Sequence, residues 1–179
     1  MGTQPPHSIP QLALSESSEN NIQEVTVPSN DYQAAEQAAQ KLSGKDEFTL
    51  LRELGMRIED AKQPGGEERR VRFDADFVDA SAEQGSEFLE QVGRKWYQNA
   101  QNELMKFLCD KKNADRDKLM SGKTVPQLAA SLATAGLLAA FAAPPAWIIV
   151  ATTILAQKIT STGIDALCQV YAEHQPKAH

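Results

Sequence analysis

The fold is decided by residues 128–156, which read LAASLATAGLLAAFAAPPAWIIVATTILA. They lie within a 34-residue interval, 124–157, that has no charged side chain and is bounded by Lys123 and Lys158. Pro144 and Pro145 interrupt this interval, because proline donates no backbone hydrogen bond and disfavours helical geometry in the residue before it. The sequence therefore predicts an alanine-rich helical hairpin with arms over residues 125–142 and 145–159, Pro145 starting the second arm.

Three environments are consistent with this hairpin. A helix that is apolar on all sides belongs at the centre of a packed protein, where other helices or a partner cover it. The interval also exceeds the length criterion for a membrane helix, and basic side chains from Lys111 to Lys123 would mark a cytoplasmic entry side. The third alternative is a sheltered hairpin that a trigger releases into a membrane. We favour burial in protein because arms of this length reach only about 22–27 Å, which is marginal for the hydrocarbon core.

Two sets of apolar side chains are the candidate interaction residues. The hairpin, facing either protein or lipid, supplies Leu128, Leu132, Leu137, Leu138, Phe141, Pro144, Pro145, Trp147, Ile148, Ile149, Ile154 and Leu155. A long helix predicted over residues 83–110 supplies Phe88, Leu89, Val92, Trp96, Leu104 and Leu108. The second set recurs at a spacing of nearly four residues, which predicts one packing face of that helix.

Shorter helices are predicted on either side of these elements. They cover residues 32–42, 47–61 and 164–174. Asp46 is the expected N-cap of the second, and its predicted apolar stripe consists of Phe48, Leu51, Leu54 and Ile58. Gly55 is expected to weaken that helix by about 1 kcal/mol relative to alanine.

Residues 70–77 are the clear segment with a period of two. Apolar residues from Val71 to Phe77 alternate with charged ones, as in a half-buried strand. A single strand leaves its backbone groups unpaired, so residues 25–27, a second copy or another protein are the candidate partners.

The expected fold is mainly α, a small helical bundle around the apolar hairpin, with one short strand pair as an option. Residues 1–30 are rich in Gln, Ser, Asn and Pro, and a flexible, disordered tail is predicted there. Residues 31–79 are expected to hold the N-terminal helices and the strand. Residues 80–174 are expected to hold the long helix, the hairpin and the C-terminal helix, and residues 175–179 a second tail.

Charge and cysteine usage restrict the function. The net charge of −6 divides into −9 over residues 1–110 and +3 over residues 111–179, which argues against general nucleic-acid binding. Cys109 and Cys168 show no metal-ligand spacing and no disulfide framework, so two free thiols in a reducing compartment are predicted. The N-terminal residues do not resemble a signal peptide. The expected location is cytoplasmic, with the inner face of a membrane as the alternative.

The residue types associated with catalysis do not form a recognisable site. His7, His174 and His179 fall in expected tails or at a helix end. The Gly-Lys-Thr run at residues 122–124 lacks the earlier glycine that a phosphate-binding loop needs. The aspartates at positions 74, 76 and 79 are expected to form a solvated face rather than a metal site.

We therefore expect a non-enzymatic protein without cofactor, metal or small-molecule substrate. The favoured role is an accessory or scaffold protein that binds a protein partner, or a second copy of itself, through apolar helix faces. The alternative is a membrane-inserting hairpin protein, either an anchor or a conditional pore-forming effector.

Overall fold

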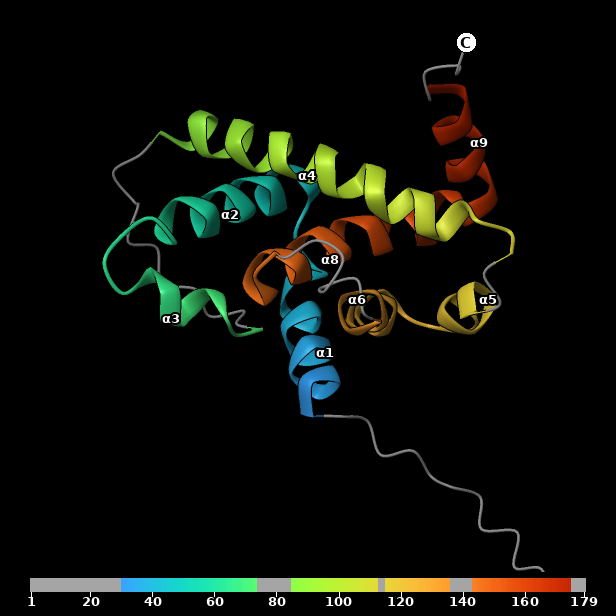
Figure 1. Ribbon diagram of the computed structural model, residues 1–179, viewed down its shortest axis with the longest axis horizontal. Helices are drawn as coiled ribbons and strands as arrows, with labels where there is room; N and C mark the ends of the chain where they lie inside the picture. Colours follow the sequence, from blue (N-terminus) through green and yellow to red (C-terminus); the bar gives the residue numbers. More distant parts are fainter. Residues whose placement is uncertain (1–29, 74–84, 113–114, 136–142, 175–179) are drawn as a thin grey trace, which may run out of the picture.

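The computed structural model describes residues 30–73, 85–112, 115–135 and 143–174. Within these ranges the chain is mainly helical, as predicted, with eight helices and no strand (Figure 1). The helices are α1 (Asn30–Leu42), α2 (Glu47–Asp60), α3 (Gly66–Arg70), α4 (Ser86–Cys109), α5 (Asp115–Met120), α6 (Val125–Thr134), α8 (Pro145–Thr162) and α9 (Ile164–His174).

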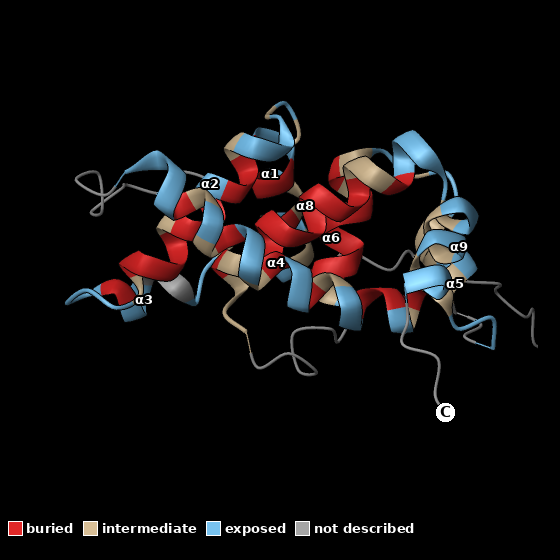
Figure 2. Cartoon of the chain, turned by 90° about the horizontal axis from the view of Figure 1, so that it is seen from above, coloured by how far each residue is buried: buried red, intermediate tan, exposed pale blue. Residues whose placement is uncertain are grey.

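Helix α8 is the central helix of the molecule. Its residues from Ala146 to Ala156 are buried, apart from the half-buried Trp147 (Figure 2). Helices α1, α2, α4, α6 and α9 all contact α8. A helix that is apolar on every face is stable in water only when neighbours cover it in this way. Helices of the same chain therefore enclose the second arm of the predicted hairpin.

Helices α6 and α8 are the two arms of that hairpin, and they pack against each other. Pro145 is the first residue of α8 and Pro144 precedes it with an extended backbone, where proline is well tolerated. Helix α6 ends at Thr134, and residues 136–142 of the predicted first arm lie outside the described residues. Small side chains dominate the contact of α6 with α1, since both helices bury alanines, namely Ala35, Ala38, Ala39, Ala129, Ala130 and Ala133.

Helices α2 and α4 run antiparallel with their backbones in contact. A Cβ atom added to Gly55 would lie 1.8 Å from the carbonyl oxygen of Leu89, and one added to Gly93 would lie 1.9 Å from that of Leu51. Neither position has room for a side chain without moving a backbone. Gly55, which propensity alone marks as a weakness of α2, is therefore a packing residue.

The start of α2 is fixed by polar contacts to its neighbours. Asp46 Oδ1 accepts a hydrogen bond of 2.9 Å from the backbone N–H of Thr49, which confirms the predicted N-cap. This bond, with a second from the Thr49 hydroxyl, lowers the pKa of the Asp46 carboxyl. Gln157 of α8 donates hydrogen bonds to the carbonyl oxygens of Ser43 (3.1 Å) and Lys45 (2.9 Å). The α1–α2 connection is thereby attached to the central helix.

The predicted strand over residues 70–77 does not form in its described part. Arg70 is the last residue of α3, and residues 71–73 continue as a turn and bend. A Cβ atom on Gly66, the first residue of α3, would lie 2.1 Å from the carbonyl oxygen of Asp60. The start of α3 thus packs closely against the end of α2. Residues 74–77 and the proposed partner 25–27 lie outside the described residues.

Cys109 and Cys168 form a disulfide, so the prediction of two free thiols is wrong. Cys109 ends α4 and Cys168 lies on α9, with a Cα–Cα distance of 5.4 Å. The two cysteines are 59 residues apart in sequence, and α5, α6 and α8 lie between them. Only the packing of α9 beside α4 brings them together, and their spacing gives no sign of it.

Candidate interaction surface

A groove of about 380 Å³ lies between α2 and α4. The α2–α4 groove is lined by Ile58, Glu59, Lys62, Phe88, Val92, Lys95, Trp96 and Asn99. Its lining combines apolar side chains with three charged ones, of which Glu59 is buried and Lys62 and Lys95 are exposed at the rim. Its aromatic lining residues, Phe88 and Trp96, come from the predicted packing face of α4.

The predicted packing face of α4 is divided between the core and this groove. Leu89, Leu104 and Leu108 are buried, as predicted. Phe88 is 50% exposed, and Val92 and Trp96 are half-buried. The reason is the contact through Gly93, because the helix turns its glycine rather than its largest side chains towards α2. The aromatic half of the predicted face is therefore left at the surface.

An edge-on aromatic contact supports the inner end of the groove. The rings of Trp96 and Trp147 lie 5.7 Å apart at 85°, a geometry that aromatic pairs favour. The indole N–H of Trp147 donates a hydrogen bond of 3.2 Å to the carbonyl oxygen of Arg57. Trp147, one of the predicted hairpin residues, links α8 to α2 and α4.

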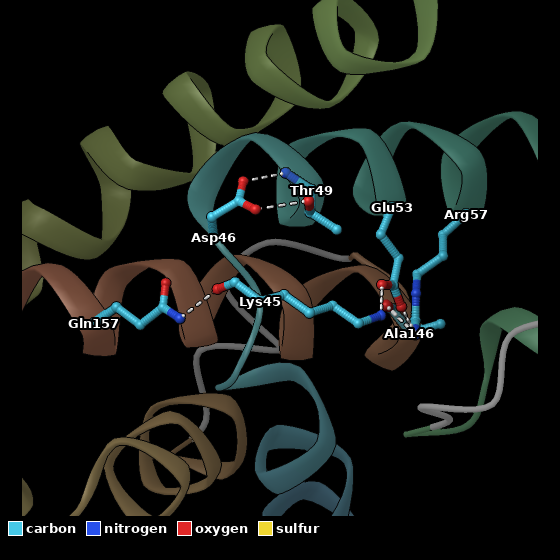
Figure 3. Close-up of polar contacts among 7 residues, drawn as sticks. All are labelled: Lys45, Asp46, Thr49, Glu53, Arg57, Ala146 and Gln157. Atoms are coloured by element: carbon cyan, nitrogen blue, oxygen red, sulfur yellow. Dashed lines mark hydrogen bonds and ion pairs between the residues drawn. The ribbon is translucent and has the colours of Figure 1, made fainter. Parts of the chain in front are cut away.

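A buried charge cluster lies between α2 and α8 (Figure 3). The guanidinium of Arg57 is 2.8 Å from Glu53 Oε1 and donates a 2.9 Å hydrogen bond to the carbonyl oxygen of Ala146. Lys45 binds the other carboxylate oxygen of Glu53. Arg57 is 1% exposed and Glu53 5%. The cluster joins α2 to the first turn of α8.

This cluster is not apparent from the sequence. Its one signal is the spacing of Glu53 and Arg57, which are four residues apart on a helix. On an exposed helix the same spacing indicates a solvated pair, and only the packing of α8 against α2 buries it. Phe48, by contrast, belongs to the predicted apolar stripe of α2 and is 51% exposed.

The charged side chains of the groove have both signs. Glu59 is bound by Lys62, with an N–O distance of 2.6 Å. Lys95 has no ion-pair partner among the residues that the structure describes. The rim therefore presents two exposed ammonium groups, that of Lys95 and that of Lys62, which is paired with Glu59.

Most described hairpin residues are core residues rather than surface residues. Pro144, Pro145 and Trp147 are half-buried, and Leu137, Leu138 and Phe141 lie outside the described residues. The buried members of the set are Leu128, Leu132, Ile148, Ile149, Ile154 and Leu155. In the described parts of the chain, no single helix has both the length and the hydropathy for a membrane span. Helices α8 and α9 meet that test jointly, with a bend of 109° between them.

The described residues contain no group of three or more histidine, cysteine or acidic side chains placed to bind a metal ion. The aspartates considered at positions 74, 76 and 79 lie outside them, as do His7 and His179. Comparisons with protein-family models, with curated proteins and with solved structures each found no match.

Tyr97 is one of the buried residues of α4 and carries a polar hydroxyl group. The Tyr97 side chain is 2% exposed, and its hydroxyl has no hydrogen-bond partner among the described residues. Burial, with a smaller contribution from Glu47, raises the pKa of this phenol above its ordinary value of 10.0. The fold therefore favours neutral Tyr97, and the stabilisation linked to it is lost as pH rises above about 10.

We expect Tyr97→Phe to raise the free energy of unfolding by about 1 kcal/mol at neutral pH, because the variant buries no unpaired hydroxyl. The wild type should also lose more stability than the variant between neutral pH and about pH 11, where the unfolded phenol ionises. Urea unfolding at both pH values measures the two effects. Equal pH dependence of the two proteins would contradict the assignment.

Proposed function

We propose that the protein is a non-enzymatic accessory or scaffold protein that binds a protein partner through the α2–α4 groove. The observation that carries this proposal is the half-exposed Phe88, which lies beside Val92 and Trp96 in the groove. Aromatic side chains set in a concave, well-supported surface are typical of the residues that dominate binding energy at protein interfaces.

The groove favours a partner with a particular chemistry. A volume of about 380 Å³ is at the lower end of small-molecule sites and suits one or two inserted apolar side chains. Its position between two antiparallel helices suits an amphipathic helix, which inserts apolar anchors into such grooves. Lys95 on the rim favours an acidic residue in the partner, next to its apolar anchor.

In this proposal the binding surface is the α2–α4 groove and not the apolar hairpin. We propose that its arms serve as the structural core, because α8 is buried by α1, α2, α4, α6 and α9 of the same chain. A partner is then needed to cover the groove rather than the hairpin. Binding of the protein to lipid vesicles without a protein partner would favour the membrane-inserting alternative.

The disulfide between Cys109 and Cys168 bears on the proposed cytoplasmic location. A disulfide in a cytoplasmic protein is usually transient and redox-sensing, whereas persistent disulfides belong to oxidising compartments. The Cys109–Cys168 bond therefore fits the cytoplasm if reductants of that compartment can break it.

The test compares two phenylalanines of equal exposure. Phe88 is 50% exposed within the groove, and Phe48 is 51% exposed on α2, outside the residues that line it. Partners are isolated with the full-length wild type from its native cells, and each is then purified and titrated against the wild type, Phe88→Asp and Phe48→Asp. We expect Phe88→Asp to weaken the dissociation constant by about 30-fold, as for an interface hot spot, and Phe48→Asp to leave it unchanged.

Two results would overturn the proposal. One is a purified partner that binds Phe88→Asp as tightly as the wild type. The other is equal weakening by both substitutions, because a general loss of surface hydrophobicity would then explain the effect. Circular dichroism of both variants serves as the folding control.

A further inference from the structure

Helix α9 is the least embedded of the long helices. None of its residues is buried, and Val170 is 51% exposed. It contacts α4 and α8, and Ile164, Leu167 and Tyr171 are half-buried there. Gly163, with φ of +87°, ends α8 and allows α9 to turn away by 109° (Figure 1). Little apolar burial therefore holds α9 in its position.

Three specific ties attach α9 to the rest of the molecule. Asp165 forms an ion pair of 2.8 Å with Arg116 of α5, and the Tyr171 hydroxyl donates a hydrogen bond of 3.1 Å to the carbonyl oxygen of Asn102 in α4. The Asp165 side chain is 91% exposed, so water screens that pair. The third tie is the disulfide from Cys168 to Cys109. It joins α9 covalently to the end of α4.

The disulfide is accessible to a reductant. Both cysteines are half-buried and line an open hollow of about 700 Å³. Lys106, Lys111 and Arg116 also line this hollow and outnumber its two carboxylates, those of Asp110 and Asp165. Nearby cations stabilise a thiolate, which is the leaving group when a disulfide is attacked.

We propose that Cys109–Cys168 is a redox modification site at which a dithiol reductant releases α9. A thiolate of the reductant attacks one sulfur of the bond, and the other cysteine leaves with the electron pair as a thiolate. The second thiol of the reductant then displaces the protein sulfur from the mixed disulfide. The reductant ends as a disulfide, and its two protons end on Cys109 and Cys168.

Release changes the surface of the protein without unfolding its core. Leu167 and Tyr171 lose their contacts with α4 and α8 and become exposed. Helices α2, α4, α6 and α8 keep their mutual contacts, since none of these passes through α9. The site is independent of the α2–α4 groove, so this inference and the proposed function can fail separately.

Hydrogen exchange of the full-length protein tests the proposal. Protein purified without reductant is compared with the same protein treated with dithiothreitol, and with the Cys109→Ser/Cys168→Ser variant. Reduction should accelerate amide exchange in α9 at least tenfold and leave α2 unchanged. The double variant should match the reduced protein with or without dithiothreitol. Tyr171→Phe in the reduced protein should accelerate α9 further.

Three results of this experiment would overturn the proposal. Two free thiols in protein purified without reductant would mean that the bond does not form. Unchanged exchange in α9 after reduction would mean that the remaining contacts hold the helix. Equal acceleration in α2 and α9 would mean that the bond stabilises the whole fold rather than one helix. Binding through the groove, compared for the wild type and Phe88→Asp, is measured separately.

Discussion

Replacing Gly55 by alanine is expected to lower the free energy of unfolding by about 3 kcal/mol, although the same change favours an isolated helix by about 1 kcal/mol. The added methyl group would lie 1.8 Å from the Leu89 carbonyl oxygen and 2.6 Å from its carbonyl carbon. Both are backbone atoms, so no side-chain rotation relieves the clash. Helices α2 and α4 must separate, and the apolar side chains along their contact lose packing.

The measurement is urea unfolding of Gly55→Ala, with Gly44→Ala as the matched control. An added Cβ at Gly44 has no neighbour within 4 Å, so that variant should be as stable as the wild type. Gly93→Ala should act like Gly55→Ala. The double variant should lose less than the sum of the two, because helices that are already separated have no second clash. A Gly55→Ala variant that is more stable than the wild type would show that propensity outweighs packing here.

Arg57→Met is expected to lower the free energy of unfolding by about 3 kcal/mol. The substitution keeps most of the side-chain volume but leaves the buried Glu53 carboxylate with Lys45 as its remaining partner, and it removes the donor to the Ala146 carbonyl oxygen. Removing one partner of a buried ion pair typically costs about 3–5 kcal/mol, and the remaining lysine places this case at the lower end.

A double variant separates the charge from the packing. Glu53→Leu/Arg57→Met removes both buried charges, so it should be more stable than Arg57→Met alone. Lys106→Met provides the exposed control, since Lys106 and Glu103 form a pair in which both side chains are more than half exposed. That variant should unfold at the wild-type urea concentration. A double variant less stable than Arg57→Met would refute the idea that unpaired burial of Glu53 causes the loss.

The helices could be predicted from the sequence because periodicity and caps are local properties. Asp46 before residues 47–61 and Pro145 at the start of the second arm both predict boundaries close to those of the structure. The faces of the helices were harder to predict. Periodicity groups Phe88 and Phe48 with buried apolar residues, yet each is about half exposed. Helices α2 and α4 face each other through Gly55 and Gly93, so these two phenylalanines lie at the surface.

The remaining features depend on contacts between distant parts of the chain. Glu53 and Arg57 look like a surface pair until α8 packs over them. Cys109 and Cys168 are a pair only because α9 returns to the end of α4. The alternation from Val71 onward resembles a strand, yet the close approach of Gly66 to α2 places a helical turn directly before it.

The central position of α8 has a consequence for synthesis on the ribosome. Helices α1, α2, α4 and α6 all precede α8 in the chain and are made before it, yet each contacts it in the finished fold. Until α8 emerges, the faces that these helices turn towards it have no surface to pack against. Folding of this chain is therefore completed late, and its nascent form is a natural substrate for chaperones that shield exposed apolar surface.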